Sequence, residues 1–214
     1  FHTWMFKRAT GFFDVVAYSG TSVAGSKNHN LGVVPELMFV KRRSLGGGQG
    51  WNVYAAPLGN TSFITLNTNQ SAFTGQSVWN STTPTDSVFY LNTDAEVNSS
   101  SYTYVAYLFA TLAGVSKVGT YTGTGADLNV DCGFSAGARW IMIKRSDSTG
   151  DWYVWDSVRG ITAGNDPYML LNTAAAQVTN TDYIDPLSSG FTVTSSAPAA
   201  LNASGGTYIF LAIA

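Results

Sequence analysis

Very few side chains in this sequence are suited to acid–base, nucleophilic or metal chemistry. There are two histidines, His2 and His29, and a single cysteine, Cys132. Neither histidine has a second histidine or a cysteine at the spacing of a metal site. One cysteine cannot form an intramolecular disulfide, and we expect Cys132 to be a small buried side chain. The sequence therefore predicts no metal site, no cofactor and no nucleophile paired with a base.

The acidic residues are the remaining candidates for catalysis. Asp147, Asp151 and Asp156 lie around one tryptophan strand, and Asp182 and Asp185 share a loop. Two carboxylates on either side of the bond would be needed for glycoside hydrolysis, and carboxylate oxygens are also suitable ligands for calcium. In β-rich proteins, aspartates more often hydrogen-bond their own turn backbone. We therefore predict a protein that is not an enzyme, with a polysaccharide depolymerase as the weaker alternative.

The segments that carry these residues occur twice along the chain. The offset between matching segments runs from 101 to 105 residues. The matches include YSGT at 18–21 with YTGT at 121–124, Lys41-Arg42 with Lys144-Arg145, Leu-Asn-Thr at 66–68 with 171–173, and the apolar segments ending at Ala110 and Ala214. This period suits a whole domain better than a solenoid turn. We expect a linker from a preceding segment at 1–10, one repeat at 11–111 and a second at 112–214.

Short alternating apolar segments, bounded by Gly, Asn, Asp, Ser or Pro, dominate both repeats, and helical periodicity is nearly absent. The segments TYVAYLFA and TYIFLAIA, at 103–110 and 207–214, are apolar at consecutive positions, so we expect central strands covered on both faces. The sequence predicts an all-β protein built as two tandem antiparallel β-sandwiches from an internal duplication.

One hairpin is repeated closely: an apolar strand ending in Lys-Arg, a polar turn with glycine, and a tryptophan strand. Alternation places Trp51 with Val53, and Trp152 with Val154, and we expect these tryptophans in the core. Tyr54 and Trp155 then fall on the opposite face, available to a ligand.

The Lys-Arg pairs end their strands, where charge discourages the addition of another strand. An anionic ligand is the less favoured alternative. The turns after them diverge, with Arg43 beside SLGGGQG in one copy and Asp151 beside SDSTGD in the other. If the hairpin binds a ligand, we expect it to do so at these turns.

The composition limits the partners. Charged residues make up 11% of the chain, and the net charge is −2. A protein without a basic stripe is poorly suited to nucleic acid, and no apolar run reaches the length of a membrane helix. Aromatic residues reach 14%, and flat rings can stack on the C–H faces of sugars. Trp79 and Tyr183 precede prolines in matching loops, so we take them as ligand contacts together with Tyr54, Trp155, Arg43 and Asp151.

Several phrases together resemble a known family. They are WMFKRATGFFDVVAYSGT, HNLGVVPELMFVKRRS, YVAYLFA, the stretch from VGTYTGTGADLNVDCGF to DWYVWDS, and the final YIFLAIA. These phrases are similar to repeats in tail-fibre proteins of tailed bacteriophages, especially marine and cyanobacterial phages. The resemblance spans nearly the whole chain and implies a concanavalin-like lectin fold. It also suggests that Phe1 continues from a preceding repeat. The resemblance identifies no binding residue.

The resemblance implies a virion protein, extracellular when it acts and commonly a homotrimer. The first hypothesis is a non-catalytic module that adheres to a host-surface glycan or protein receptor, beside other virion tail proteins. The alternative is a structural spacer or capsid-decoration domain that acts in virion assembly.

Overall fold

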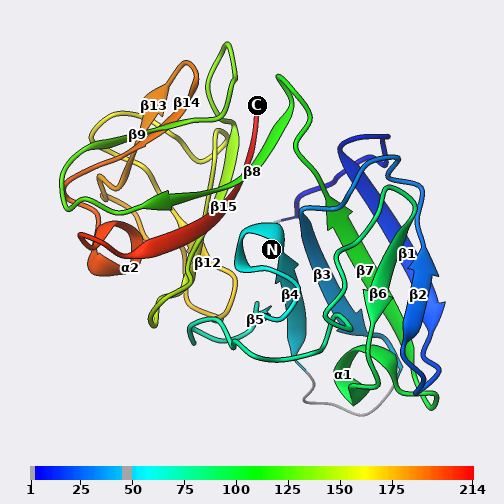
Figure 1. Ribbon diagram of the computed structural model, residues 1–214. Coiled ribbons are helices and arrows are strands. Elements are labelled where there is room, and N and C mark those ends of the chain that lie inside the picture. Colours follow the sequence, from blue (N-terminus) through cyan, green and yellow to red (C-terminus); the bar gives the residue numbers. More distant parts are fainter. Residues whose placement is uncertain (1–2, 45–49) are drawn as a thin grey trace. The chain divides into compact units, whose positions relative to one another are not determined.

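The computed structural model describes residues 3–44 and 50–214, and the chain divides into two compact units (Figure 1). Unit 1 consists of Phe1–Phe63 and Phe73–Thr111, and unit 2 consists of Ile64–Ala72 and Leu112–Ala214. The all-β expectation is confirmed, because the α-helices of the described residues are limited to α1 (Ala95–Asn98) and α2 (Ala199–Asn202). No helix in this part of the chain is long and apolar enough to cross a membrane.

Unit 1 contains two antiparallel sheets. Four strands of the larger sheet pair in the order β1 (Phe13–Ser19), β7 (Thr103–Phe109), β3 (Leu37–Arg42) and β4 (Trp51–Ala55). The smaller sheet pairs β2 (Gly25–Asn28) with β6 (Val88–Leu91), and a 3-10 helix, η1 (Ala56–Leu58), follows β4. Both sheets contribute buried side chains to one hydrophobic cluster, including Met38, Tyr104 and Phe89. This cluster is the core of unit 1.

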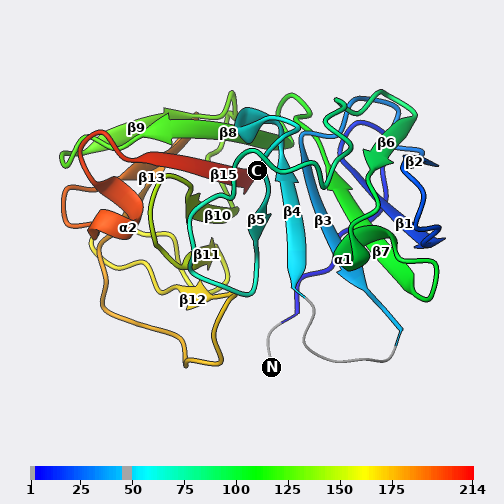
Figure 2. The same cartoon turned by 60° about the horizontal axis from the view of Figure 1, so that its bottom comes forward.

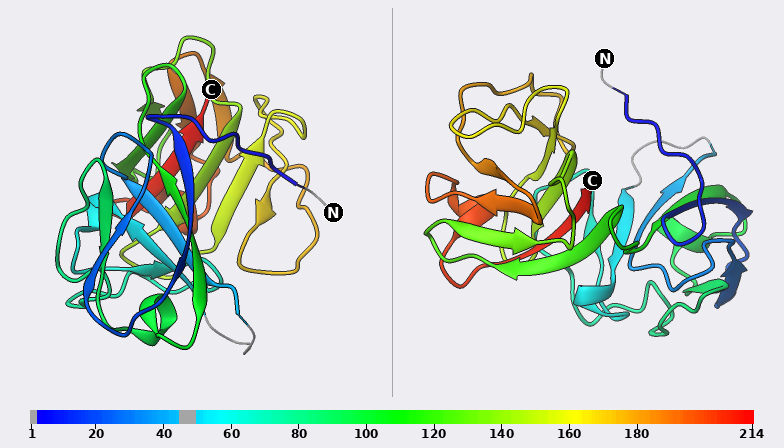
Figure 3. Two further views of the ribbon diagram at one scale, coloured as in Figure 1. Left: turned by 90° about the vertical axis from the view of Figure 1, so that its right-hand side faces the viewer. Right: turned by 90° about the horizontal axis from the view of Figure 1, so that it is seen from above.

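Unit 2 has a similar plan, with three strands instead of two in its second sheet. The larger sheet has the order β12 (Met169–Leu170), β11 (Trp152–Asp156), β10 (Trp140–Arg145), β15 (Thr207–Ile213) and β8 (Ser116–Thr122). The smaller sheet has the order β13 (Ile184–Leu187), β14 (Gly190–Val193) and β9 (Leu128–Asp131), seen with β13 and β14 in orange (Figure 3). Ile141, Phe210 and Phe191 belong to the core that the two sheets share.

The expectation of two central strands is confirmed. β7 lies between β1 and β3, and β15 lies between β10 and β8. Of the six residues that follow Thr207 in β15, five are buried and Ile213 is half-buried. A strand with hydrogen-bonded neighbours on both sides and both faces covered is expected to carry apolar residues at consecutive positions.

The repeated Tyr-x-Gly-Thr phrase makes the same contacts in both units. The rings of Tyr18 and Tyr104 stack with centroids 5.2 Å apart, and those of Tyr121 and Tyr208 stack at 4.8 Å. The hydroxyl of Tyr18 donates to the carbonyl of Val97 at 2.8 Å, and that of Tyr121 donates to Leu201 at 2.7 Å. These contacts attach the sheet to α1 in unit 1 and to α2 in unit 2.

The glycine of the phrase is required by a close backbone approach. A Cβ atom on Gly20 would lie 2.1 Å from the carbonyl oxygen of Ser99, and one on Gly123 would lie 2.3 Å from that of Ala203. The next residue then donates its backbone N–H to a buried amide, Thr21 to Asn98 at 3.0 Å. The corresponding bond in unit 2 joins Thr124 to Asn202 at 2.9 Å.

The predicted faces of the tryptophan strands are wrong. Tyr54 belongs to the core cluster of unit 1, and Trp155 belongs to that of unit 2. By alternation, Trp51 lies on the face of its sheet that points away from the Tyr54 core, and Trp152 lies on the face that points away from the Trp155 core. Sequence alternation could not assign the faces, because both faces of these strands carry large apolar side chains.

Trp152 is nevertheless fully buried, because the part of the first repeat at 64–72 belongs to unit 2. This segment, which we call the inserted segment, begins with β5 (Ile64–Thr65). Its Thr65 carbonyl accepts a hydrogen bond from the Trp152 indole at 2.9 Å. Lys144 is also fully buried, so the expectation that this Lys-Arg pair ends in solvent is wrong for the lysine. The inserted segment is drawn in cyan beside β11 and β12 (Figure 2).

Candidate functional site

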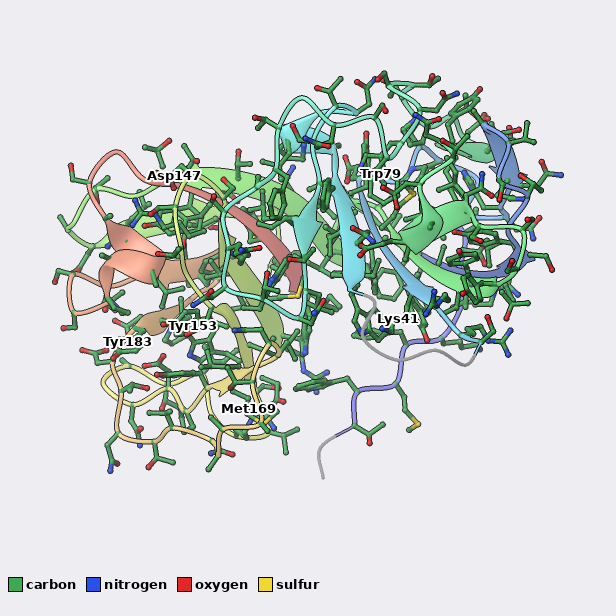
Figure 4. All side chains as sticks on the ribbon, turned by 90° about the horizontal axis from the view of Figure 1, so that it is seen from below. Lys41, Trp79, Asp147, Tyr153, Met169 and Tyr183 are labelled. Atoms are coloured by element: carbon green, nitrogen blue, oxygen red, sulfur yellow. The ribbon has the colours of Figure 1, made fainter. Side chains whose placement is uncertain are left out.

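The most extensive group of aromatic rings with partial solvent access in unit 2 is formed by Tyr153, Trp155, Tyr168 and Tyr183, which we call the tyrosine cluster. Tyr153 and Tyr183 are labelled in Figure 4. The ring of Tyr168 is central. Its centroid lies 5.0 Å from that of Tyr153, 5.9 Å from that of Trp155 and 5.6 Å from that of Tyr183. Rings at these separations and tilts stabilise one another beyond the area that they bury.

Each ring is held by a different local element. Tyr153 and Trp155 are two residues apart on β11, so they lie on one face of the sheet and stack at 5.7 Å. Tyr168 forms an isolated antiparallel bridge with Val178. Tyr183 stands directly before β13. The cluster therefore connects the larger sheet of unit 2 with the loop that leads to its smaller sheet.

The cluster has a buried base and a partly exposed edge. Tyr153 and Trp155 are buried, whereas Tyr168 and Tyr183 are half-buried. Burial raises the pKa of the Tyr153 hydroxyl well above its ordinary value and also raises the pKa of Tyr168. Both phenols therefore stay neutral at physiological pH, where each can donate and accept a hydrogen bond.

Asp166 fixes the position of Tyr183. Its carboxylate is fully buried and accepts the backbone N–H of Tyr183 at 2.7 Å and that of Ile184 at 3.1 Å. Burial raises the pKa of this carboxyl to about 6, against the lowering effect of these two backbone bonds. Since no part of Asp166 is exposed, it acts as a structural anchor and not as a group that contacts a ligand.

A polar edge lies beside the rings. Asp151 accepts a hydrogen bond from the side-chain amide of Asn172 at 2.7 Å, and the amide oxygen of Asn172 accepts the N–H of Trp152 at 2.9 Å. The Asp151 carboxylate contributes to the raised pKa of Tyr153 and of Tyr168. Asp151 is half-buried, so a carboxylate, an amide and two phenols are available at one edge.

Three of the predicted contact residues come together in this region. Trp155 and Tyr183 both pack on Tyr168, and Asp151 lies near enough to influence that hydroxyl. Trp155 itself is fully buried, so the prediction of a direct ligand contact is corrected to a supporting role. Burial follows from its place in the core between the two sheets of unit 2.

The remaining predicted residues lie in unit 1. Tyr54 and Trp79 pack edge to face at 5.8 Å, and both are almost fully buried. The indole of Trp79 donates to the carbonyl of Ser62 at 2.9 Å. The prediction that Tyr54 and Trp79 contact a ligand is therefore corrected: both are core residues, and a buried ring has no exposed face for a ligand. Arg43 is exposed, and most of the turn that follows it lies outside the described residues.

The two units differ at equivalent positions. Trp79 corresponds by its offset of 104 to Tyr183. The buried Trp79 donates its indole N–H to Ser62 in unit 1, whereas the half-buried Tyr183 donates its backbone N–H to Asp166 in unit 2. Phe63 bridges Phe73 as Tyr168 bridges Val178. Unit 2 therefore has tyrosines where unit 1 has a tryptophan and a phenylalanine, and only the tyrosines carry a hydroxyl group.

Sequence reasoning missed Tyr168 and Asp166. Tyr168 could have been found by aligning it with Phe63, because the substitution adds a hydroxyl at an otherwise apolar repeat position. Asp166 has no comparable signal. It resembles the turn aspartates, and only its burial distinguishes it.

His29, Cys132 and Asp156 have structural roles. His29 is buried, accepts the N–H of Leu31 and lies 3.2 Å from the carbonyl of Thr85. Cys132 is buried, as predicted, and burial raises the pKa of its thiol to about 12. Asp156 accepts the N–H groups of Val158 and Arg159, in the expected turn role. His2 lies outside the described residues, which contain no group of three or more metal-binding side chains.

Residues 6–214 match a family described as a domain of unknown function, DUF7483, and the chain belongs to that family. No curated protein and no solved structure matches the chain.

Proposed function

We propose that this chain is a non-catalytic adhesion module that binds a host-surface glycan through the tyrosine cluster of unit 2. The observation that carries the proposal is the half-buried pair Tyr168 and Tyr183 on a buried aromatic base, beside Asp151 and Asn172. A ring can stack on the C–H face of a sugar, while phenol, amide and carboxylate groups hydrogen-bond its hydroxyls. These groups are held by the fold, so little ordering is needed on binding.

A site with two partly exposed rings is small, and weak binding at each copy is expected. Several copies on one particle would raise the overall avidity without a new contact. This requirement agrees with the proposed setting, an extracellular fibre of a bacteriophage virion with several copies of the chain. We further propose that both units are β-sandwiches of lectin-like type, derived from one duplicated domain, on the basis of their matched Tyr-x-Gly-Thr contacts.

The proposal is tested by binding of the purified chain to an array of bacterial surface glycans. Tyr183→Ala and Tyr168→Ala should each weaken a positive signal about 5- to 150-fold, since stacking on one ring contributes on the order of 1–3 kcal/mol where it has been measured for bases. Tyr90→Ala is the matched control, because Tyr90 is a half-buried tyrosine on β6 of unit 1. Unchanged binding by both unit 2 variants would show that the cluster is not the site.

The second candidate is an assembly role, as a spacer or capsid-surface domain. One observation favours it: a segment of one repeat completes the unit formed by the other repeat. A unit that is completed by a segment from the other repeat of the same chain could be completed in the same way by a segment from another chain. The molar mass of the purified chain tests this role independently of glycan binding.

A further inference from the structure

A carboxylate shares the face of the sheet on which the tyrosine cluster lies. Residues two apart along an extended strand point to the same side, so Asp151, directly before β11, shares a face with Tyr153 and Trp155. At about 3.4 Å per residue, roughly 7 Å of strand separate Asp151 from Tyr153. Tyr153 is opposite Leu170 on β12, and the same register places Asn172 opposite Asp151. The hydrogen bond of 2.7 Å between these two side chains agrees with that register.

One oxygen of the Asp151 carboxylate is open to a ligand. Oδ1 accepts the hydrogen bond from Asn172, and no group in residues 3–44 or 50–214 donates a hydrogen bond to Oδ2. Asp151 also forms no ion pair within this part of the chain. The residue is half-buried, so a ligand can reach it. A donor there would form a charge-assisted hydrogen bond, roughly twice as strong as a neutral one.

Two further carboxylates add negative charge near the rings. Asp166 is fully buried and accepts the backbone N–H of Tyr183. Asp182 directly precedes Tyr183, and its buried Oδ1 has no hydrogen-bond partner among the described residues. Burial is the main cause of the raised pKa of Asp166, and the charge of Asp182 adds to it. Neither carboxylate forms an ion pair with a described residue, so the cluster lies in a negative field.

Lys144 is a cation that interacts with Asp151. Burial lowers the pKa of the Lys144 ammonium, and the charge of Asp151 opposes that change. Lys144 is opposite Trp152, which points away from the core face that carries the rings, so the ammonium lies on the other face of the sheet. It is fully buried and donates to the carbonyls of Gln70 and Arg145 at 2.8 and 2.7 Å. Lys144 therefore balances part of the negative charge but does not occupy Oδ2 of Asp151.

The first repeat has uncharged residues at all three carboxylate positions. By offsets of 101, 105 and 104, Asp151, Asp166 and Asp182 correspond to Gly50, Thr61 and Val78. Unit 1 forms its two sheets without these charges, so the shared fold does not require them. Buried charge without an ionic partner is costly to a domain, and departures of this kind are expected at functional sites.

We propose that the ligand of the tyrosine cluster is a glycan with free amino groups, whose protonated amine binds at the Asp151 carboxylate beside the rings of Tyr168 and Tyr183. An ammonium group donates three hydrogen bonds, and it is attracted to the face of an aromatic ring within about 6 Å of the centroid. An amino sugar combines this charge with a C–H face for stacking. The inference rests on the proposed glycan binding and names its substrate class.

The test compares three tetrasaccharides that share one ring and linkage and differ at carbon 2: tetraglucosamine, tetra-N-acetylglucosamine and cellotetraose. Isothermal titration calorimetry at a mildly acidic pH, where the amines are protonated, measures the affinity of the purified chain for each. Tetraglucosamine should bind at least about tenfold more tightly than the two uncharged oligomers, because only it forms the charge-assisted contacts. Its affinity should fall as salt is added.

A peptide provides the control for charge alone. Tetralysine with both ends blocked has as many amines as tetraglucosamine but no sugar ring, and it should bind at least about tenfold more weakly, because it lacks the stacking contact. If the peptide binds as tightly as tetraglucosamine, the site recognises only charge and the inference is wrong.

The outcomes separate this inference from the proposed function. Equal affinities for the three tetrasaccharides, or tighter binding of an uncharged one, would overturn the amine inference and leave glycan adhesion in place. The same holds if tetraglucosamine fails to bind to a chain that binds glycans without amines. A chain that binds no glycan at all would overturn both.

Asp151→Asn tests whether Asp151 supplies the charge. The amide oxygen of asparagine can still accept the hydrogen bond from Asn172, so the substitution removes the charge with little change in shape. The affinity for tetraglucosamine should fall at least about tenfold, whereas the affinities for the uncharged oligomers should stay within about twofold.

Asp131→Asn is the matched control, because Asp131 is an exposed aspartate on β9 of unit 2 and the substitution removes the same charge. It should leave all the affinities unchanged. Equal losses in the two variants, or unchanged binding of tetraglucosamine by Asp151→Asn, would contradict the proposal. Thermal unfolding verifies that both variants are folded, and the comparison among oligomers needs no substitution, so it decides the matter even if Asp151→Asn is unstable.

Discussion

The indole N–H of Trp152 donates a hydrogen bond of 2.9 Å to the carbonyl of Thr65, 87 residues earlier in the chain. This relationship explains why Trp152 is fully buried without belonging to the core between the sheets of unit 2. A ring in this position is packed on one side by its own sheet and capped by a backbone that it hydrogen-bonds.

Trp152→Phe should lower the free energy of unfolding by about 1–3 kcal/mol, because it leaves the buried Thr65 carbonyl without its donor. Trp152→Ala should cost about 3–5 kcal/mol, because it also leaves a cavity. Denaturant unfolding followed by tryptophan fluorescence and circular dichroism measures both. The control is Trp51→Phe at the equivalent, half-buried position, where the loss should be smaller. A loss well below about 1 kcal/mol for Trp152→Phe would mean that the bond to Thr65 adds nothing.

The hydroxyls of Tyr104 and Tyr208 provide a test of the duplication. Tyr104 donates to the carbonyl of Ala95 and accepts the N–H of Ser99, each at 2.8 Å. Tyr208 donates to Ala199 at 2.7 Å and accepts from Ala203 at 2.8 Å. Phenylalanine at either position removes the hydroxyl and therefore both of its hydrogen bonds. The free energy of unfolding of each variant should fall by about 1–3 kcal/mol.

Thermal unfolding of Tyr104→Phe, Tyr208→Phe and the control Tyr90→Phe measures the effect. If the two units are copies of one domain, the first two variants should lose similar amounts and the control almost nothing. A large loss at only one of the two tyrosines would show that the matched geometry does not reflect matched energetics.

The buried carboxyl of Asp166 gives the protein a defined pH dependence. Its pKa is raised by burial to about 6 from an ordinary value of 3.8, so the folded chain binds this proton more tightly than the unfolded chain. The contribution of Asp166 to stability is therefore fully present below about pH 3.8 and is lost as the pH rises through 6.

Asp166→Asn should flatten the dependence of the unfolding free energy on pH between 4 and 6.5, even if the variant is less stable overall. Chemical denaturation at several pH values measures the slope, and Asp86→Asn, at an exposed position, should leave it unchanged. A slope that survives in Asp166→Asn would assign the pH dependence to other groups.

Much of the fold follows from local patterns. The hairpins of β3 with β4 and of β10 with β11 were expected from an apolar strand, a polar turn and a tryptophan strand, and the central position of β7 and β15 from apolar residues at consecutive positions. These features depend on neighbours in the sequence or on the general need to cover both faces of a central strand. Local pattern therefore suffices to predict them.

The faces of the hairpins and the inserted segment could not be predicted in the same way. Trp152 and Trp155 are three residues apart on opposite faces of β11, and both are fully buried, so alternation identifies two apolar faces without saying which one meets the second sheet. The inserted segment contributes carbonyl groups, which every residue has. Its Leu-Asn-Thr phrase is identical in both repeats, so the sequence contains no sign that one copy belongs to the other unit.

The glycines of the Tyr-x-Gly-Thr phrase are the last case, because here a sequence match has a definite steric cause. Gly20→Ala and Gly123→Ala would each place a methyl group within 2.1 to 2.3 Å of a carbonyl oxygen. The strand must then separate from the turn after α1 or α2. The free energy of unfolding of each variant should therefore fall by about 1–3 kcal/mol. Gly25→Ala is the control, since the nearest atom to its Cβ lies 4.0 Å away, and it should be neutral or stabilising by about 0.4–1 kcal/mol. Melting temperatures measure all three, and a tolerated alanine at either Gly20 or Gly123 would contradict the close approach.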